Sequence, residues 1–147
     1  MIHLPGEGRV LDFGPFSMTV KAEMADTSGE LTVLEATEPA GFGPPMHVHD
    51  DAGEAFYVLE GEYLIVVEEK EYHCPEGSFI YIPKGVLHGF RVGNVPSRKL
   101  NIYVPGAMMG YFDGLAEAHA TGASPDLLSL ATASHMQVLG EVPEGYV

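Results

Sequence analysis

The chain has 147 residues, the length of one domain that can bury a hydrophobic core, and its single cysteine, Cys74, permits no internal disulfide. It carries 21 acidic and 7 basic residues, a formal net charge of −14 at pH 7, which argues against the clustered cations of a nucleic-acid-binding surface. No apolar run approaches the roughly 20 residues of a membrane span, and the N-terminus shows no secretory leader. We therefore expect a cytoplasmic protein that binds neither nucleic acid nor membrane.

The 18 glycines and 11 prolines separate short runs of β-branched and aromatic residues, a pattern typical of an all-β sandwich or barrel. The predicted strands are residues 18–23, 31–38, 46–49, 55–60, 63–67, 71–74, 78–82, 89–92 and 99–104. The short connections at 60–62 and 68–70 predict antiparallel hairpins. The Pro-x-Gly sequences at 75–77 and 83–85 predict reverse turns.

After Gly106 the pattern becomes helical. Met108, Met109, Phe112 and Leu115 have helical spacing and predict a helix over residues 107–120. Ser124 as N-cap, with Pro125 in the first helical position, predicts a second helix to about residue 135, followed by a short strand and a loop. The first helix could be a lid over the barrel, but its spacing equally fits packing on the outside of the sheet, which we favour.

The sequence therefore predicts one domain over residues 1–147, with a barrel core at about 18–104 and helices within about 107–135. The short helical segment follows the barrel, and no internal repeat or linker indicates a second domain.

Four residues have the spacing of a metal site. His47 and His49 are two residues apart, so on a strand both imidazoles point to the same face. Glu54 follows a predicted turn at 50–53, and His88 follows the turn at 83–85. Three neutral imidazoles and one carboxylate suit one divalent transition ion (Fe, Ni, Co, Mn, Cu or Zn) and leave coordination positions open.

The same residues belong to two spaced motifs. The first consists of Gly41, His47, His49, Glu54 and Gly61, and the second of Gly77, Pro83, Gly85 and His88. Both resemble the motifs of the cupin superfamily, although Val92 stands where the second motif has an Asn that is not a metal ligand. In their general residue pattern, residues 103–112 and the helical tail are most similar to small bacterial cupins of the flavonol (quercetin) dioxygenase type.

This resemblance implies a double-stranded β-helix, or jelly-roll barrel, with metal ligands at His47, His49, Glu54 and His88. It further implies a metal-dependent dioxygenase that joins dioxygen to a phenolic or enolic, flavonol-like substrate. Glu54 would be both a ligand and the catalytic base, since a carboxylate near a metal-bound hydroxyl is placed to take its proton. A homodimer is also expected from the resemblance.

Strand parity predicts an apolar pocket. If Glu54 points inward, so does Phe56, and the same argument places Phe90 beside His88 on the inner face. We expect Met46, Phe56 and Phe90 to form the walls that bind an apolar or aromatic substrate.

Two other function classes stay open. A redox-neutral isomerase, lyase or polyketide cyclase could use the same residues with zinc as a Lewis acid. A non-catalytic small-molecule-binding cupin is the third candidate. The remaining chemistry-bearing residues have simpler interpretations: Cys74 as an inert thiol, His73 as a surface residue, and Asp50 and Asp51 as a solvated turn.

Overall fold

The structure is a computed structural model that describes residues 1–142 of the chain. The strands in the predicted region are β2 (Ser17–Ala22), β3 (Thr32–Glu38), β4 (Met46–His49), β5 (Gly53–Glu60), β6 (Glu62–Val67), β7 (Lys70–Pro75), β8 (Phe79–Ile82), β9 (His88–Val92) and β10 (Ser97–Val104). Each lies within two residues of a predicted strand, because β-branched and aromatic runs between Gly and Pro turns leave little freedom in where a strand begins.

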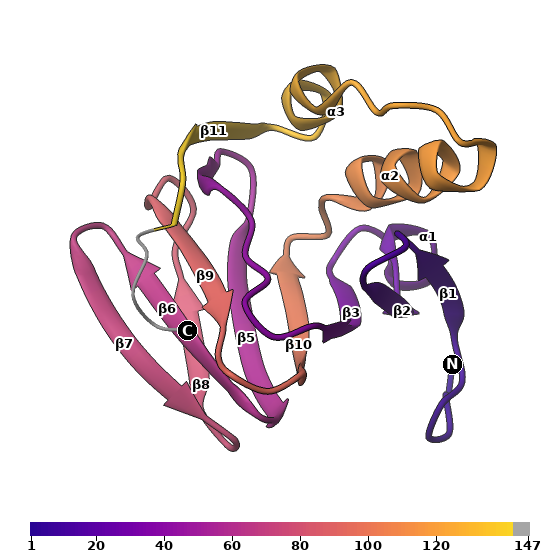
Figure 1. Ribbon diagram of the computed structural model, residues 1–147. Coiled ribbons are helices and arrows are strands. Elements are labelled where there is room, and N and C mark those ends of the chain that lie inside the picture. The colour runs from indigo at the N-terminus through magenta and orange to yellow at the C-terminus, as the bar shows by residue number, and fades with distance from the viewer. Residues whose placement is uncertain (143–147) are drawn as a thin grey trace.

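These strands form two antiparallel sheets that face each other (Figure 1). The six-stranded sheet has the order β1-β2-β3-β10-β5-β8, and the five-stranded sheet has the order β11-β4-β9-β6-β7. Strands that are distant in sequence, such as β3 and β10, pair within one sheet. This arrangement confirms the all-β, double-stranded β-helix predicted for the chain.

The connections show which strands change sheet. β6 and β7 pair as the predicted hairpin, whereas β5 and β6 lie in different sheets, so the hairpin predicted at 60–62 is wrong. Gly61 has a positive φ of 76°, which lets the chain turn the corner between the sheets. Both predicted reverse turns are present, with hydrogen bonds from Ser78 N to Pro75 O and from Val86 N to Pro83 O.

Two elements were not predicted, β1 (Arg9–Asp12) and the single-turn helix α1 (Met24–Thr27). β1 is an edge strand in which only Leu11 is buried, so its sequence carries almost no alternating pattern. It is held in place by antiparallel pairing with β2.

The C-terminal segment contains α2 (Met109–Thr121), α3 (Leu127–Ala133) and β11 (Met136–Gly140). The predicted N-cap of the second helix is wrong: Asp126 caps α3 by accepting a hydrogen bond from Ser129 N, and Pro125 precedes the helix. The predicted strand after it is β11, which pairs with β4. The end of the predicted loop, residues 143–147, lies outside the described residues.

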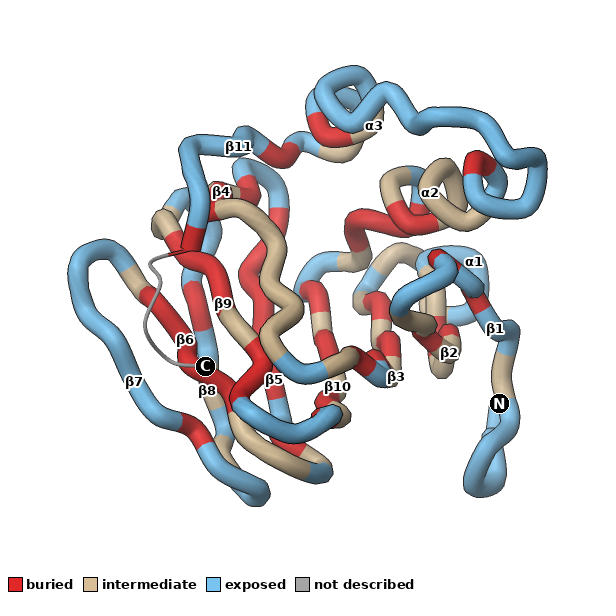
Figure 2. Tube along the Cα trace, viewed as in Figure 1, coloured by how far each residue is buried: buried red, intermediate tan, exposed pale blue. Residues whose placement is uncertain are grey.

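Burial follows the facing sides of the two sheets (Figure 2). Along β5, inward Glu54, Phe56 and Val58 are buried while Tyr57 is exposed, and inward His88, Phe90 and Val92 of β9 are buried as strand parity predicts. The interior between the sheets therefore holds both the hydrophobic core and the predicted metal ligands.

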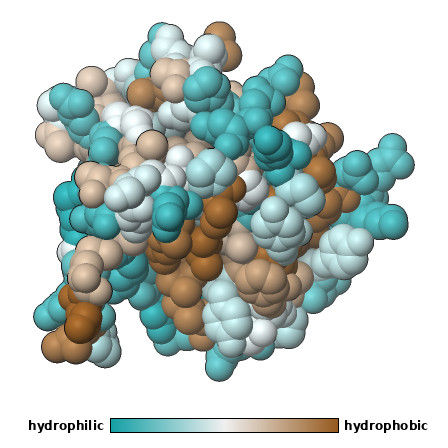
Figure 3. All heavy atoms as spheres, turned by 180° about the vertical axis from the view of Figure 1, so that it is seen from behind, coloured by the Kyte–Doolittle hydropathy of each residue, from teal (hydrophilic) through white to brown (hydrophobic). Residues whose placement is uncertain are grey.

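The outer surface is not uniformly polar. Seen from behind, hydrophobic side chains form a band between hydrophilic ones (Figure 3). Exposed large apolar residues include Tyr57 of β5 and Phe79 and Tyr81 of β8. The expected homodimer is not tested by a single chain and stays a prediction. Within residues 1–142, no helix has the length and apolar character needed to cross a bilayer.

Candidate metal centre

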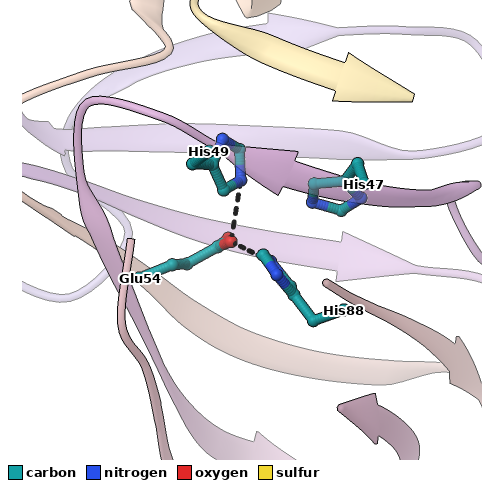
Figure 4. A group of neighbouring side chains, drawn as sticks. All are labelled: His47, His49, Glu54 and His88. Carbon is teal, nitrogen blue, oxygen red and sulfur yellow. Dashed lines mark hydrogen bonds and ion pairs between the residues drawn. The ribbon is translucent and has the colours of Figure 1, made fainter. Parts of the chain in front are cut away.

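The four predicted ligands come together between the two sheets. His47 and His49 come from β4 and His88 from β9, which are neighbours in the five-stranded sheet, with His47 and His88 paired in register. Glu54 reaches them from β5 of the opposite sheet. In Figure 4 the carboxylate of Glu54 points toward the imidazoles of His49 and His88.

The donor atoms are close enough to share one ion. One ligand atom from each of the four residues lies within 4.8 Å of all the others, and none of the four residues is more than 7% exposed. Oε2 of Glu54 lies 2.8 Å from Nε2 of His88 and 3.0 Å from Nε2 of His49. Burial of three imidazoles and a carboxylate in one small volume is costly unless their charges and lone pairs are satisfied together.

Backbone carbonyls orient two of the imidazoles. Nδ1 of His47 lies 2.7 Å from the carbonyl oxygen of Pro45, and Nδ1 of His88 lies 2.9 Å from that of Val86. A carbonyl only accepts, so each Nδ1 carries the proton and donates it. Each Nε2 is then the nitrogen left for the cluster, as in metal-binding histidines whose other nitrogen is hydrogen-bonded, and without an ion that of His88 donates to Glu54.

The pKa shifts of His47 and Glu54 favour their ligand-competent forms, whereas the hydrogen bond and charge of Glu54 outweigh burial and raise the pKa of His88, whose proton a bound ion would displace. Burial, followed by the neighbouring His88, lowers the pKa of His47 to about 4, so this imidazole is neutral at physiological pH. Burial alone would raise the pKa of Glu54, but its close contacts with the imidazoles of His49 and His88 outweigh burial and hold that pKa well below its ordinary value. The carboxylate is therefore ionised and available as a ligand.

His49 adds an observation that fits a metal ion. Both of its ring nitrogens are buried and have no hydrogen-bond partner among residues 1–142, since Nε2, although close to Glu54, lacks hydrogen-bond geometry. Unpartnered buried polar atoms are rare because each costs about 1–3 kcal/mol. A divalent ion bound by Nε2 of the histidines and by the Glu54 carboxylate would satisfy the cluster, so the residues present fit the implied metal.

The centre opens on a cavity of about 310 Å³. His47, His49 and Glu54 form its polar end, and most other lining side chains are apolar, among them Phe16, Phe42 and Phe90. This size is at the small end of the range for ligand pockets.

Of the three predicted wall residues, Phe90 lines this cavity, whereas Met46 and Phe56 do not. Met46 alternates with His47 along β4, so it points to the opposite face of the sheet, where it packs with Leu64 and Val66. Phe56 points inward as predicted but is fully buried behind Phe90, with their ring centroids 5.9 Å apart.

The C-terminal helices contribute to the cavity as well. Met108 and the α2 residues Tyr111, Phe112 and Leu115 line it, together with Leu127 of α3. The interpretation that the predicted helix packs only on the outside of the sheet is therefore wrong. Its apolar side also packs against Leu11 and other buried residues of the six-stranded sheet, so one amphipathic face serves both core and cavity.

Sequence reasoning missed Tyr103, Asn101 and Glu38, which also line the cavity. Tyr103 is paired in register with Glu54, and its ring centroid lies 5.3 Å from that of His49. Burial, and then the charge of Glu54, raise the pKa of Tyr103 well above its ordinary value, so its hydroxyl keeps its proton. Strand parity applied to β10 would have found it, since Lys99, Asn101 and Tyr103 share one face.

The residues expected to have simple roles are not part of the ligand cluster. Cys74 is buried, and burial raises the pKa of its thiol, which makes it a poor nucleophile. His73, Asp50 and Asp51 are on the exposed surface.

Comparison with known proteins agrees with this geometry. The cupin domain family matches residues 33–103, which include all four candidate ligands. The chain is 27% identical over 126 residues to quercetin 2,3-dioxygenase of Bacillus subtilis, a match that covers 84% of this chain but only 37% of that protein.

Solved structures share the fold. An RmlC-like cupin from Shewanella frigidimarina superposes with a TM-score of 0.62 at 18% identity, covering 71% of this chain and 89% of the other. The polyketide cyclase RemF of Streptomyces resistomycificus superposes with a TM-score of 0.55 at 22% identity, covering 67% and 69% respectively. Residues 33–103 therefore match the cupin domain family, and the two facing sheets have the fold of the solved small cupins.

Proposed function

We propose that this protein is a metal-dependent dioxygenase that acts on an apolar phenolic or enolic, flavonol-like small molecule. The observation that carries the proposal is the position of the His47, His49, Glu54 and His88 cluster at one end of a cavity that is otherwise largely apolar and aromatic. The distant similarity to quercetin 2,3-dioxygenase supports the same substrate class, although the chain spans little more than a third of that protein.

Each ligand has a defined part. His47 and His88 present Nε2 to the ion because backbone carbonyls hold their Nδ1 protons, and His49 completes the set of imidazoles. With a divalent ion and the Glu54 carboxylate, the site has a net charge of about +1, which favours an anionic enolate or phenolate oxygen. The bound ion would supply a Lewis-acidic, redox-capable centre with open positions for substrate and dioxygen.

Glu54 is the proposed catalytic base. Its carboxylate is ionised, buried, and directed toward the same point as the imidazoles. It can therefore accept the hydroxyl proton of an incoming enol, whose removal generates the anionic oxygen. Tyr103 lies beside it as a protonated phenol, positioned to donate a hydrogen bond to that carboxylate or to the substrate.

The cavity determines the shape of the substrate. Phe90, Phe42 and Phe16 present ring surfaces, which suit a flat aromatic compound more than a sugar or a phosphate ester. Side chains from α2 also line the cavity, so they would shield part of a bound substrate from bulk water.

The test is oxygen uptake with quercetin by protein loaded separately with Fe, Ni, Co or Mn. We expect uptake that depends on the metal and falls at least about 100-fold in Glu54→Gln, which keeps the size of the side chain but removes the base. Glu71→Gln, the same change on the exposed strand β7, should leave the rate unchanged.

The outcomes separate the three function classes. No oxygen uptake across a panel of enols and catechols with any metal would overturn the dioxygenase proposal. Conversion without oxygen in zinc-loaded protein would indicate a redox-neutral lyase, isomerase or cyclase. Binding without any conversion, unaffected by Glu54→Gln, would indicate a small-molecule-binding protein.

A further inference from the structure

The inner face of β10 is polar along its whole length, in contrast to the apolar faces around it. Ser97, Lys99, Asn101 and Tyr103 alternate along the strand and are all buried, with exposed fractions of 3% or less. Polar side chains inside a small barrel need hydrogen-bond partners.

Lys99 is fully satisfied. Its ammonium lies 3.0 Å from each carboxylate oxygen of Glu38 and 4.1 Å from the ring centroid of Phe90. The hydroxyl of Tyr63 donates a third hydrogen bond to Glu38, at 2.8 Å. Lys99, Glu38 and Tyr63 therefore form a polar network whose members are hydrogen-bonded to one another, which accounts for their burial.

Asn101 is different. Its cross-strand neighbours, Phe56 on β5 and Leu34 on β3, cannot form a hydrogen bond with it. Its amide N–H contacts the hydroxyl of Tyr103 on the same face, a hydrogen bond that works to lower the pKa of that hydroxyl. Oδ1 of Asn101 is buried without a hydrogen-bond partner among residues 1–142, although the side chain lines the 310 Å³ cavity. Outside the metal centre, the other such atom in that part of the chain is Nε of Arg91, which does not line the cavity.

An amide oxygen without a partner at this position works against folding, because a leucine of similar volume would avoid the loss of hydration. Its position on the cavity wall indicates a partner that comes from the cavity. We propose that Asn101 is a second recognition point of this pocket and accepts a hydrogen bond from a hydroxyl group of the substrate at a distance from its metal-binding oxygen.

The register of β10 against β5 gives the distance between the metal end and the second recognition point. Tyr103 is opposite Glu54, and Asn101 is one inward position further along β10, which corresponds to about 7 Å along the strand. The substrate class is therefore a flat aromatic enol or phenol with two polar ends, one at the metal and a hydroxyl about one ring further into the pocket. This inference rests on the proposed function, since it takes the metal end of the substrate from that proposal.

The test compares two flavonols bound to zinc-loaded protein, in which no oxidation competes with binding. Quercetin and 3-hydroxyflavone share the metal-binding 3-hydroxyl and 4-carbonyl, but only quercetin has further hydroxyl groups. We expect the wild type to bind quercetin about tenfold more tightly, the effect of one buried hydrogen bond, and Asn101→Leu to lose that preference. Asn94→Leu, the same change at an exposed position, is the matched control and should keep it.

Two further measurements separate recognition from a structural role. Asn101→Leu should retain the zinc content of the wild type and have an equal or higher Tm, because removal of an acceptor without a partner among residues 1–142 at least offsets the lost contact of the amide N–H with Tyr103. A lower Tm, with equal weakening of both flavonols, would show that Asn101 is structural and would overturn the inference. If Asn101→Leu still prefers quercetin as the wild type does, the inference is also overturned, because Asn101 then binds water and not the substrate.

Failure of the proposed function has a different signature. If the zinc-loaded wild type binds neither flavonol, the flavonol-like substrate is wrong. The Tm of Asn101→Leu then decides the second recognition point alone: an equal or higher value supports it, and a lower value overturns it.

Discussion

The buried ion pair between Lys99 and Glu38 permits a quantitative test of the interior. Both side chains have no exposed surface, and Lys99 Nζ is 3.0 Å from both carboxylate oxygens. Lys99→Met keeps the length of the side chain and its contact with the aromatic rings of Phe56, Tyr63 and Phe90, but removes the charge. Among residues 1–142, the carboxylate of Glu38 is then buried with the Tyr63 hydroxyl as its one remaining side-chain donor.

Removing one partner of a buried pair costs roughly 3–5 kcal/mol, because it leaves an uncompensated charge. For a domain of about this length each kcal/mol corresponds to about 2–4 °C, so the Tm of Lys99→Met should fall by roughly 6–20 °C. The double variant with Glu38→Gln has no buried charge and retains an acceptor for Tyr63. It should therefore be less destabilised than either single variant, with a coupling energy of at least about 2 kcal/mol.

The assay is urea unfolding of metal-free protein followed by circular dichroism, supported by thermal melts. Arg98→Met is the matched control on the same strand: its ion pairs with Glu35 and Glu60 are partly exposed, and its loss should cost less than about 1 kcal/mol. A loss below about 1 kcal/mol in Lys99→Met, or additive losses in the double variant, would refute the interpretation of a dry, charge-paired barrel interior.

The remaining predictions concern the ligands and one turn. His49→Ala removes one of the four donors, so the metal content of the purified protein should fall to a small fraction of the wild-type value by elemental analysis, and a full complement would contradict a shared site. The pKa of His47 is about 4 in the folded protein and 6.5 in its ordinary state, so on acidification the unfolded chain binds this proton first. The free energy of unfolding of the metal-free protein should therefore fall by roughly 3 kcal/mol between about pH 6.5 and 4. His47→Gln should flatten that part of the urea-unfolding profile, and an unchanged slope would assign it to other groups. Gly61→Ala should destabilise by roughly 2 kcal/mol or more, because a Cβ there would overlap Ser97 and φ is positive. Gly77→Ala, with a positive φ but open space around it, should cost about 1 kcal/mol, and equal losses would show that the contact with Ser97 contributes nothing.

The strands and the ligand cluster could be predicted because both depend on local patterns. Short β-branched runs between turn residues specify where strands lie, and two imidazoles two residues apart must share a face. The same argument could have predicted the orientation of Met46: because His47 and His49 face inward, Met46 has to face outward, and it does. The error there came from applying parity to one strand and not to its neighbour.

The pocket could not be predicted from local patterns. Phe56 and Phe90 have the same inward parity, yet only Phe90 meets the cavity, because the layer that each side chain occupies depends on how the two sheets stack. Strand parity places Asn101 on the inner face of β10, but the lack of a partner for its amide oxygen was hidden, since its neighbours there come from β3 and β5, far apart in the chain.

The sequence alone therefore determined the all-β class, the approximate strand positions and the identity of the four candidate ligands. These follow from side-chain alternation and from spacings of a few residues. The tertiary structure decided that residues 60–62 pass between the sheets, that α2 forms one wall of the cavity, and that this cavity is lined by an amide whose oxygen has no hydrogen-bond partner in the described part of the chain. Each of these depends on contacts between segments distant in the chain, and the separation of such segments in space is set by packing of the whole barrel.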